Sequence, residues 1–294
     1  MTRDRLPGGT HPGRIRLQVA DLERSLAYYE GILGLRRLEE TGGAASLGAD
    51  RPLVELRERP GAAPAPRGGR PGLYHFALLV PDRATLGGLA RHLAGAGVPL
   101  GASDHLVSEA LYLRDPDGLG IEVYRDRPRS SWRRRGGQLV MATEPLDLED
   151  LRRAGDGADW DGMPAGTTVG HVHLHVGDLE MAARFYEEGL GLERTVWSYP
   201  GALFLSAGGY HHHLGLNTWA ASDRPPGEGD ARLLEWELLV PDAGAAAAAL
   251  GSLEGAGHEI ERGASGGLVR DPWGTALRLG AEPPAPVDGE AARR

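Results

Sequence analysis

Four stretches of the chain alternate apolar and polar residues with the period of two that is typical of a half-buried strand, and a helix-forming stretch follows each. Two of these regions, 17–35 and 174–192, share more than half of their positions. Each runs from a short strand through Asp-Leu-Glu into a helix that ends at Gly-Leu. Asp21 and Asp178 are predicted helix N-caps, because a carboxylate can accept the unpaired amide protons of a first helical turn.

A second internal repeat is weaker but extends over the same kind of elements. The matching stretches are 73–98 and 234–258, each followed by a turn and a strand, at 113–124 and 268–279. The chain therefore contains four strand–helix–strands units. In chain order the units cover about 12–57, 72–126, 168–220 and 233–280. Between the second and third units lies a polar stretch in which one helix is predicted, at 147–155.

Composition narrows the range of functions. Charged residues make up 25% and hydrophobic residues 41% of the 294 positions, which is normal for a soluble globular protein. The net charge of −9 argues against a nucleic-acid partner, and the Arg-rich stretch 125–135 is more typical of a solvated linker than of a phosphate-binding patch. There is no cysteine, so disulfides, thiol nucleophiles and Cys-zinc sites are excluded. Without a signal-like or membrane-length apolar segment, a cytoplasmic protein is expected, and a homo-oligomer is compatible with the sequence.

The four units resemble the vicinal oxygen chelate superfamily, which includes glyoxalase I, the fosfomycin and bleomycin resistance proteins and the extradiol dioxygenases. The resemblance implies an α+β fold of four βαβββ modules that form two open barrels, with metal ligands on the first and last strands of paired modules. The implied organisation is an N-terminal domain of modules one and two (10–126), a linker (127–167), a C-terminal domain of modules three and four (168–281) and a disordered tail (282–294). A fold of this breadth does not determine a function.

Equivalent positions in the four units hold the candidate ligands. Counting seven residues back from the Asp that ends each first strand gives Arg14, His75, His171 and Glu235, and the last-strand position holds Glu122 in unit two and Arg278 in unit four. Only units two and three together supply the two His and one Glu that the extradiol dioxygenases use. We therefore predict a metal site of His75, Glu122 and His171, and a charge cluster of Arg14, Glu235 and Arg278 in the other pair. Two imidazoles and a carboxylate suit Fe(II), and Mn(II) would suit the same set.

The stretch 104–124 resembles the extradiol signature, which implies that His105 and Tyr112 contact the substrate. The stretch "GGYHHHLGLN" (208–217) implies an acid–base histidine. His212 matches that position best, with His211 and His213 as alternatives. A buried carboxylate such as Glu122, on an apolar strand, needs a cation or a metal.

His173 and His175 share the predicted strand face of His171. They are interpreted as structural residues or as part of the pocket lining.

The predicted function is that of an extradiol ring-cleaving dioxygenase, similar to the two-domain catechol 2,3-dioxygenases, which converts a catechol and O2 to a 2-hydroxymuconic semialdehyde at a mononuclear non-haem Fe(II). One alternative is a glyoxalase-like metal-dependent lyase or isomerase. Such sites usually have a fourth, carboxylate ligand on the partner's last strand, where this chain reads "HHLGLN". The other alternative is a non-catalytic, drug-binding resistance protein. Whether modules two and three pair within one chain or across a dimer is left open.

Overall fold

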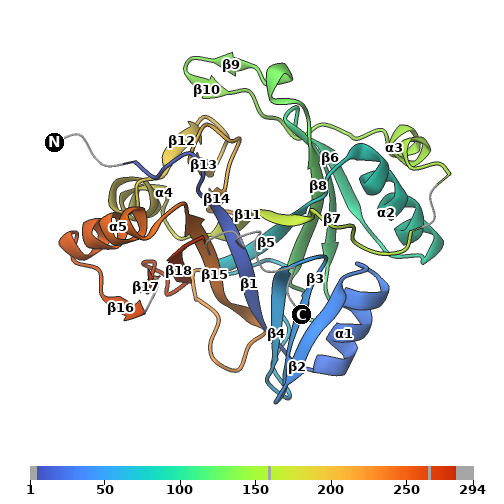
Figure 1. Cartoon of the computed structure of the whole chain (residues 1–294), viewed down its shortest axis with the longest axis horizontal. Coiled ribbons are helices and arrows are strands. Elements are labelled where there is room, and N and C mark those ends of the chain that lie inside the picture. Colours follow the sequence, from blue (N-terminus) through green and yellow to red (C-terminus); the bar gives the residue numbers. More distant parts are fainter. Residues whose placement is uncertain (1–4, 158–159, 264–265, 283–294) are drawn as a thin grey trace, which may run out of the picture.

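The structure, a computed structural model, describes residues 5–157, 160–263 and 266–282, and most of its strands lie in two curled eight-stranded sheets (Figure 1). The first sheet contains β1 (His11–Val19), β2 (Arg36–Thr41), β3 (Ala44–Gly48), β4 (Pro52–Glu58), β15 (Arg232–Val240), β16 (Ile260–Gly263), β17 (Gly266–Arg270) and β18 (Ala276–Ala281). The second contains β5 (Gly72–Leu79), β6 (Gly101–Asp104), β7 (Ser108–Arg114), β8 (Gly120–Asp126), β11 (Thr168–His175), β12 (Glu193–Val196), β13 (Ala202–Ser206) and β14 (Leu214–Asn217). This architecture confirms the predicted α+β fold with two open barrels.

Each sheet combines strands from the two ends of the chain. β1 pairs antiparallel with β15, which joins units one and four, and β5 pairs antiparallel with β11, which joins units two and three. The predicted pairing of units two and three is therefore confirmed, and it occurs within one chain. The division into domains at 127–167 remains an interpretation of the sequence repeat, because each sheet takes strands from both sides of that segment.

The helices lie on the outer faces of the sheets (Figure 1). They are α1 (Leu22–Gly31), α2 (Arg83–Gly95), α3 (Leu148–Ala154), α4 (Leu179–Ala183) with the π-helical continuation η2 (Arg184–Gly189), and α5 (Ala243–Gly255). The carboxylates of Asp21 and Asp178 accept from the amides of Arg24 and Met181, which confirms both predicted N-caps. The helix predicted at 147–155 is α3.

Buried tyrosines connect the units that follow one another in the chain. The hydroxyl of Tyr29, on α1, donates to Asp115 Oδ2 of unit two at 3.2 Å. The hydroxyl of Tyr186, on η2, donates to Asp271 Oδ2 of unit four at 2.9 Å. These equivalent contacts connect unit one to two and unit three to four, whereas the sheets connect one to four and two to three. The four units are thus held in a closed ring.

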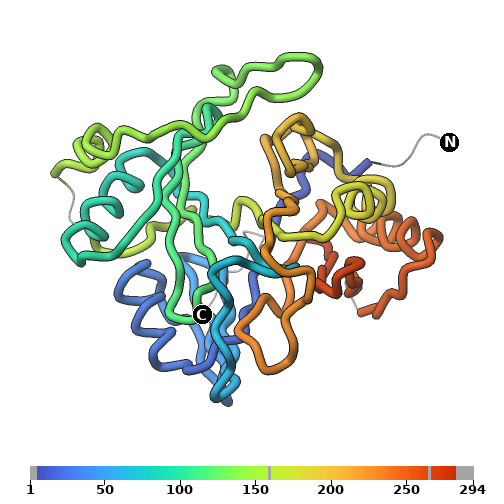
Figure 2. The backbone as a smooth tube through the Cα atoms, turned by 180° about the vertical axis from the view of Figure 1, so that it is seen from behind, coloured from blue at the N-terminus to red at the C-terminus, as the bar shows by residue number. Residues whose placement is uncertain are grey.

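The segment between units two and three crosses from one side of the second sheet to the other, as the view from behind shows (Figure 2). It contains the 3-10 turn η1 (Arg129–Ser131) and a small hairpin of β9 (Arg134–Arg135) and β10 (Gln138–Leu139). The Gln138 side chain accepts from the amides of Trp197 and Ser198 in unit three. Glu144 forms two backbone hydrogen bonds of 2.9 Å with Asp104 of unit two. The segment therefore bridges the two units that share the second sheet.

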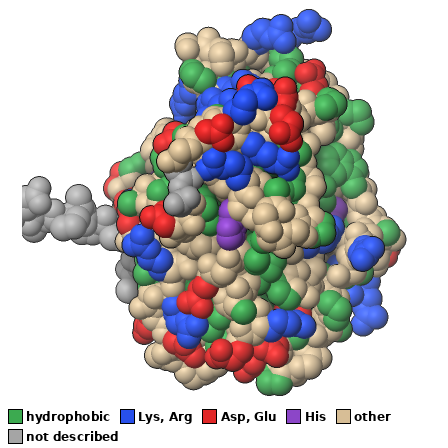
Figure 3. All heavy atoms as spheres, turned by 90° about the vertical axis from the view of Figure 1, so that its right-hand side faces the viewer, with side chains coloured by type: hydrophobic (Ala, Val, Ile, Leu, Met, Phe, Trp, Pro, Cys, Tyr) green, Lys and Arg blue, Asp and Glu red, His purple; other side chains and the backbone are tan. Residues whose placement is uncertain are grey.

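Side chains of both charges are interspersed on the face that carries α2 and α3 (Figure 3). Within the described residues, no helix has both the length and the apolar character needed to cross a lipid bilayer. The predicted disordered tail lies outside the described residues except for Glu282, whose amide donates to the Val240 carbonyl.

Candidate metal centre

Three adjacent strands bring the predicted ligands together. β5 pairs with β8 on one side and β11 on the other, so His75, Glu122 and His171 project from neighbouring strands onto one concave face. One ligand atom from each residue lies within 4.8 Å of the others. Oε2 of Glu122 is 3.0 Å from Nε2 of His75 and 3.1 Å from Nε2 of His171. All three residues are buried.

The donor set fits a divalent metal ion. Nε2 of His75 is buried and has no hydrogen-bond partner, because its approach to the Glu122 carboxylate lacks hydrogen-bond geometry. Burial lowers the pKa of His75 and of His171 despite the nearby carboxylate, which favours the neutral imidazole form that binds a metal. Burial alone would raise the pKa of Glu122, but His171 and His75 hold it well below its usual range. A buried anion with two neutral imidazoles calls for a cation.

The position that could supply a fourth protein ligand is a glycine. The β5–β11 register pairs His171 with Ala77 and His173 with His75, so a local two-fold relates Ala77 to His173. Glu122 lies beside Ala77, and Gly215 lies beside His173 in the equivalent place. A Cβ atom at Gly215 would be 2.8 Å from Cγ and Nδ1 of His173. The ring of His173 thus fills the space that a ligand side chain would need.

A cavity of about 210 Å³ adjoins the ligands, and the predicted catalytic residues His105, Tyr112 and His212 all line it. His105 donates from Nδ1 to the Ala142 carbonyl at 2.7 Å and accepts at Nε2 from the Tyr112 hydroxyl at 2.6 Å. Burial raises the pKa of Tyr112 well above 10, and Glu122 adds to this effect, so the phenol keeps its proton. The His105–Tyr112 pair is therefore fixed in one orientation at the cavity wall.

Of the three consecutive histidines in unit three, His212 faces the cavity. Its ring centroid is 4.1 Å from that of His171. His211 is fully buried behind it, and Nδ1 of His213 accepts from the Ala207 amide at 3.2 Å. The structure thus brings His212 to the site and leaves its two neighbours outside the cavity lining.

Several lining residues gave no usable signal in the sequence. Met141, Ala142 and Thr143 belong to the bridging segment that the sequence indicated only as a linker.

Asn217, which lies behind the cavity lining, was also missed by the sequence analysis. Its Nδ2 donates to Nε2 of His173 at 2.9 Å, and its Oδ1 accepts from Nδ1 of His175 at 2.6 Å. Asn217 therefore fixes the orientation of both rings.

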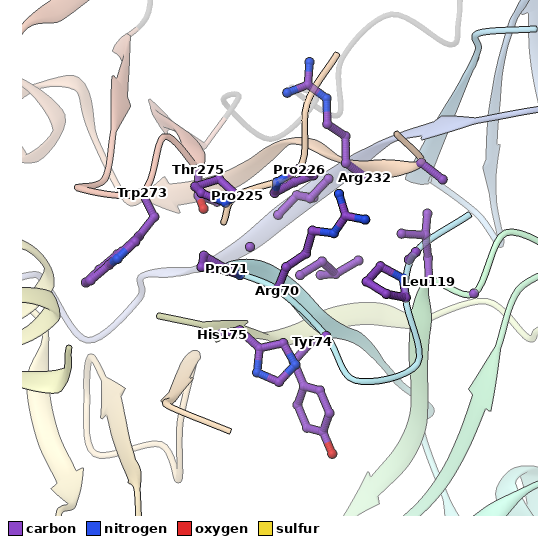
Figure 4. A pocket seen from close by; sticks show the side chains of 18 of the residues that line it. Arg70, Pro71, Tyr74, Leu119, His175, Pro225, Pro226, Arg232, Trp273 and Thr275 are labelled. Carbon is purple, nitrogen blue, oxygen red and sulfur yellow. The ribbon is translucent and has the colours of Figure 1, made fainter. Parts of the chain in front are cut away.

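Tyr74 separates this cavity from a smaller one of about 70 Å³ that lies between the two sheets. Figure 4 shows Tyr74 and His175 side by side at the edge of the smaller cavity, with Arg70 opposite. The Tyr74 and His175 ring centroids are 4.7 Å apart. Arg70 is ion-paired to Asp230 at 2.6 Å. The cavity beside the predicted metal ligands is thus closed on this side by the packed rings of Tyr74 and His175.

The first sheet has charged residues where the second has its ligands, but the predicted cluster is partly wrong. Arg278 and Glu235 do form a bidentate pair, with contacts of 2.6 and 2.7 Å. Arg14 instead pairs with Glu237, at 2.8 Å, and Arg16 approaches Glu235 at 3.5 Å. The antiparallel register explains this, because it places Arg16 and not Arg14 directly opposite Glu235.

The family model of the glyoxalase/bleomycin resistance protein/dioxygenase superfamily matches residues 11–123 and 168–279. The chain belongs to this superfamily. The superfamily relative named catechol-2,3-dioxygenase from Bacillus subtilis (strain 168) is 44% identical over 269 residues, which cover 90% of this chain and 94% of the relative. The predicted class of enzyme, an extradiol dioxygenase, is confirmed by this relative.

Solved structures of the superfamily share the fold. A provisionally named dioxygenase from Bacillus subtilis subsp. subtilis str. 168 aligns with a TM-score of 0.67 at 16% identity, over 96% of this chain and 87% of that one. Glyoxalase I from Zea mays aligns with a TM-score of 0.55 at 18% identity, over 93% and 92% of the two chains. At these identities the likeness establishes the architecture alone.

Proposed function

We propose that this enzyme cleaves a catechol next to its two hydroxyl groups, at a single Fe(II) held by His75, Glu122 and His171. Both atoms of O2 enter the product, a 2-hydroxymuconic semialdehyde. The observation that carries the proposal is the combination, in one buried place, of a two-His, one-carboxylate set with a glycine at the fourth ligand position. Such a set leaves one side of the metal free for substrate and O2.

When bound, the ferrous ion supplies Lewis acidity and the electron-transfer chemistry that O2 requires. The chain's own residues handle the substrate and its protons. His212 lines the cavity beside His171, so it is placed to take a proton from a catechol hydroxyl and to return it later. Its charged form is disfavoured, since burial and then His171 lower the pKa of His212 well below 6.5.

Tyr112 and His105 are placed to orient the substrate. The Tyr112 hydroxyl donates to His105, so its oxygen remains free to accept a hydrogen bond from a catechol hydroxyl. The bond from His105 to the Ala142 carbonyl holds this pair in place from the bridging segment. The arrangement fixes one substrate orientation relative to the ligands without a large rearrangement.

The alternative of a glyoxalase-like lyase is disfavoured by Gly215. A fourth carboxylate ligand would have to come from this position, which has no side chain and no room for one beside His173. A drug-binding protein would not need the buried His75–Glu122–His171 set next to an acid–base histidine. The presence of these residues together therefore disfavours that alternative.

The rest of the wall indicates an uncharged ring substituent. Tyr199, Phe204 and Trp219 line the cavity, and no Arg or Lys is among the described residues that do. The Tyr199 hydroxyl bonds to Thr143 Oγ1 at 2.8 Å, and Trp219 Nε1 donates to the Pro200 carbonyl at 3.1 Å. These polar atoms are already paired, so the cavity meets aromatic surface. A carboxylate substituent would lie there without a cationic partner, at a cost of roughly several kcal/mol.

Turnover by protein loaded anaerobically with Fe(II) tests this proposal. We expect O2 uptake and a yellow ring-cleavage product with catechol and 4-methylcatechol, and at least about 100-fold lower kcat/KM with 3,4-dihydroxybenzoate. His212→Ala should keep its iron and lose about 100-fold or more in kcat. Iron-loaded wild-type protein that cleaves neither neutral catechol would refute the proposal. Equal use of the carboxylated substrate would refute the interpretation of the wall alone.

A further inference from the structure

We infer that Asp126 and His211 are positioning residues that fix the tautomer of His212, so that its Nε2 is unprotonated and free toward the cavity. The acid–base role of His212 belongs to the function proposed above, and the inference deepens that proposal. What it adds is a pair of residues, neither of them in the cavity lining, that decide which nitrogen of His212 carries the proton.

Three side chains form a hydrogen-bonded row that ends at the cavity. Oδ1 of Asp126 is 2.9 Å from Nε2 of His211, and Nδ1 of His211 is 2.7 Å from Nδ1 of His212. Asp126 is the last residue of β8, the strand that carries Glu122, whereas the two histidines precede β14. The row therefore crosses the boundary between units two and three, as the ligand set does.

The direction of each hydrogen bond follows from the chemistry of the groups. A carboxylate only accepts, so His211 donates from Nε2, and an uncharged imidazole that donates from Nε2 has a bare Nδ1. A bare Nδ1 can only accept, so His212 must donate from its own Nδ1. Neutral His212 then has a bare Nε2. Among the described residues this nitrogen has no hydrogen-bond partner, and the ring lines the cavity.

A second donor holds the carboxylate in this orientation. The Tyr210 hydroxyl donates to the same Oδ1 of Asp126, at 3.2 Å, and its oxygen is 2.6 Å from the Tyr124 hydroxyl. The Asp126 side chain is 25% exposed, whereas that of His211 is fully buried. His211 is therefore shielded from solvent, and its tautomer depends on Asp126, which accepts from its Nε2.

Asp126→Asn tests the inference because an amide at this place can donate to His211 Nε2. Donation there would put the His211 proton on Nδ1, and His212 would then accept at Nδ1 and carry its proton on Nε2. Imidazole ¹⁵N spectra of the metal-free protein distinguish the two tautomers. We expect Nδ1–H on His212 in the wild type and Nε2–H in Asp126→Asn. An Nε2–H tautomer in the wild type would overturn the inference, whether or not the variant folds.

Turnover provides the second readout. In iron-loaded protein, Asp126→Asn should lower kcat by about 100-fold with KM for catechol and iron content unchanged. Asp126→Glu, which keeps a carboxylate, should recover part of that loss. Glu187→Gln is the matched control, because Glu187 is a unit-three carboxylate of similar exposure, 28%, paired with Arg194 away from the cavity. It should leave kcat unchanged.

The two readouts separate the inference from the proposed function. A wild type that cleaves catechol, with Asp126→Asn equally fast although its His212 carries the Nε2–H tautomer, would overturn the positioning role and leave the function standing. A wild type that loads iron without cleaving any catechol would refute the function, and the ¹⁵N spectra would still decide whether Asp126 sets the tautomer.

Discussion

The glycine at the fourth ligand position makes a quantitative prediction. In Gly215→Ala the new Cβ would lie 2.8 Å from Cγ and Nδ1 of His173, whereas ordinary contacts begin at 3.4 Å, so the ring must move by roughly 0.6 Å or more. His173 cannot move freely, because Asn217 bonds to it and Phe204 packs at 5.7 Å. Overpacking of this kind costs about 1–3 kcal/mol of unfolding free energy.

The same displacement should reach the reaction. The His173 ring centroid is 5.0 Å from that of the proposed ligand His75, so a shifted His173 ring disturbs both the ligand and the cavity. We expect kcat/KM for catechol to fall by roughly 10–100-fold, since small misplacements near reacting groups have effects of this size.

A double-mutant cycle isolates the steric cause. His173→Ala removes the obstructing ring, so in that background Gly215→Ala should cost less than about 0.5 kcal/mol, and the coupling should be roughly 0.5–3 kcal/mol. The measurement is urea unfolding of the four metal-free proteins at one pH, together with their iron-loaded activity. Equal costs of Gly215→Ala in both backgrounds would mean that the position is not blocked by His173, and the argument against a fourth ligand would fail.

Two further predictions concern groups outside the ligand cavity. Burial raises the pKa of Asp115 from 3.8 to about 7, so the folded state retains its proton over a range in which the unfolded chain has lost it. The unfolding free energy should therefore fall by about 3 kcal/mol as pH rises from 4 to 7. Asp115→Asn, studied by urea unfolding across that range, should remove this decline. An unchanged slope of unfolding free energy against pH would contradict the prediction that Asp115 causes it. Glu235→Gln leaves Arg278 without its bidentate partner and should destabilise the first sheet by about 1–3 kcal/mol, a figure reduced by the 41% exposure of the Arg278 side chain. Its kcat for catechol should equal that of the wild type, and a large loss would mean that the first sheet takes part in the reaction.

The repeated pattern made much of the fold predictable. Period-two strands and the Asp N-caps depend on local chemistry, so they identified the four units. The resemblance to the extradiol dioxygenases implied the ligand set of His75, Glu122 and His171, and units two and three were predicted to pair because only together do they supply it. These inferences needed no knowledge of side-chain packing.

The ion pairs of the first sheet and part of the cavity wall depend on residues of other segments, which counting positions along one strand does not reveal. Glu237 shares a strand face with Glu235, and Arg16 shares one with Arg14, so each predicted partner had a competitor two residues away. Register and side-chain reach selected the Arg14–Glu237 pair. The contribution of Ala142 to the cavity wall follows from the path of the bridging segment, which no local pattern encodes.

Iron content and ring cleavage, measured on the same set of proteins, test the metal site shared by units two and three. Wild type, His75→Ala, His171→Ala and Glu235→Gln would be loaded anaerobically with Fe(II), desalted, assayed for iron and then given catechol and air. We expect one tightly held iron and yellow product for wild type and Glu235→Gln. We expect loss of both for the two histidine variants, one from each unit. Iron and ring cleavage retained by either histidine variant would contradict the central claim.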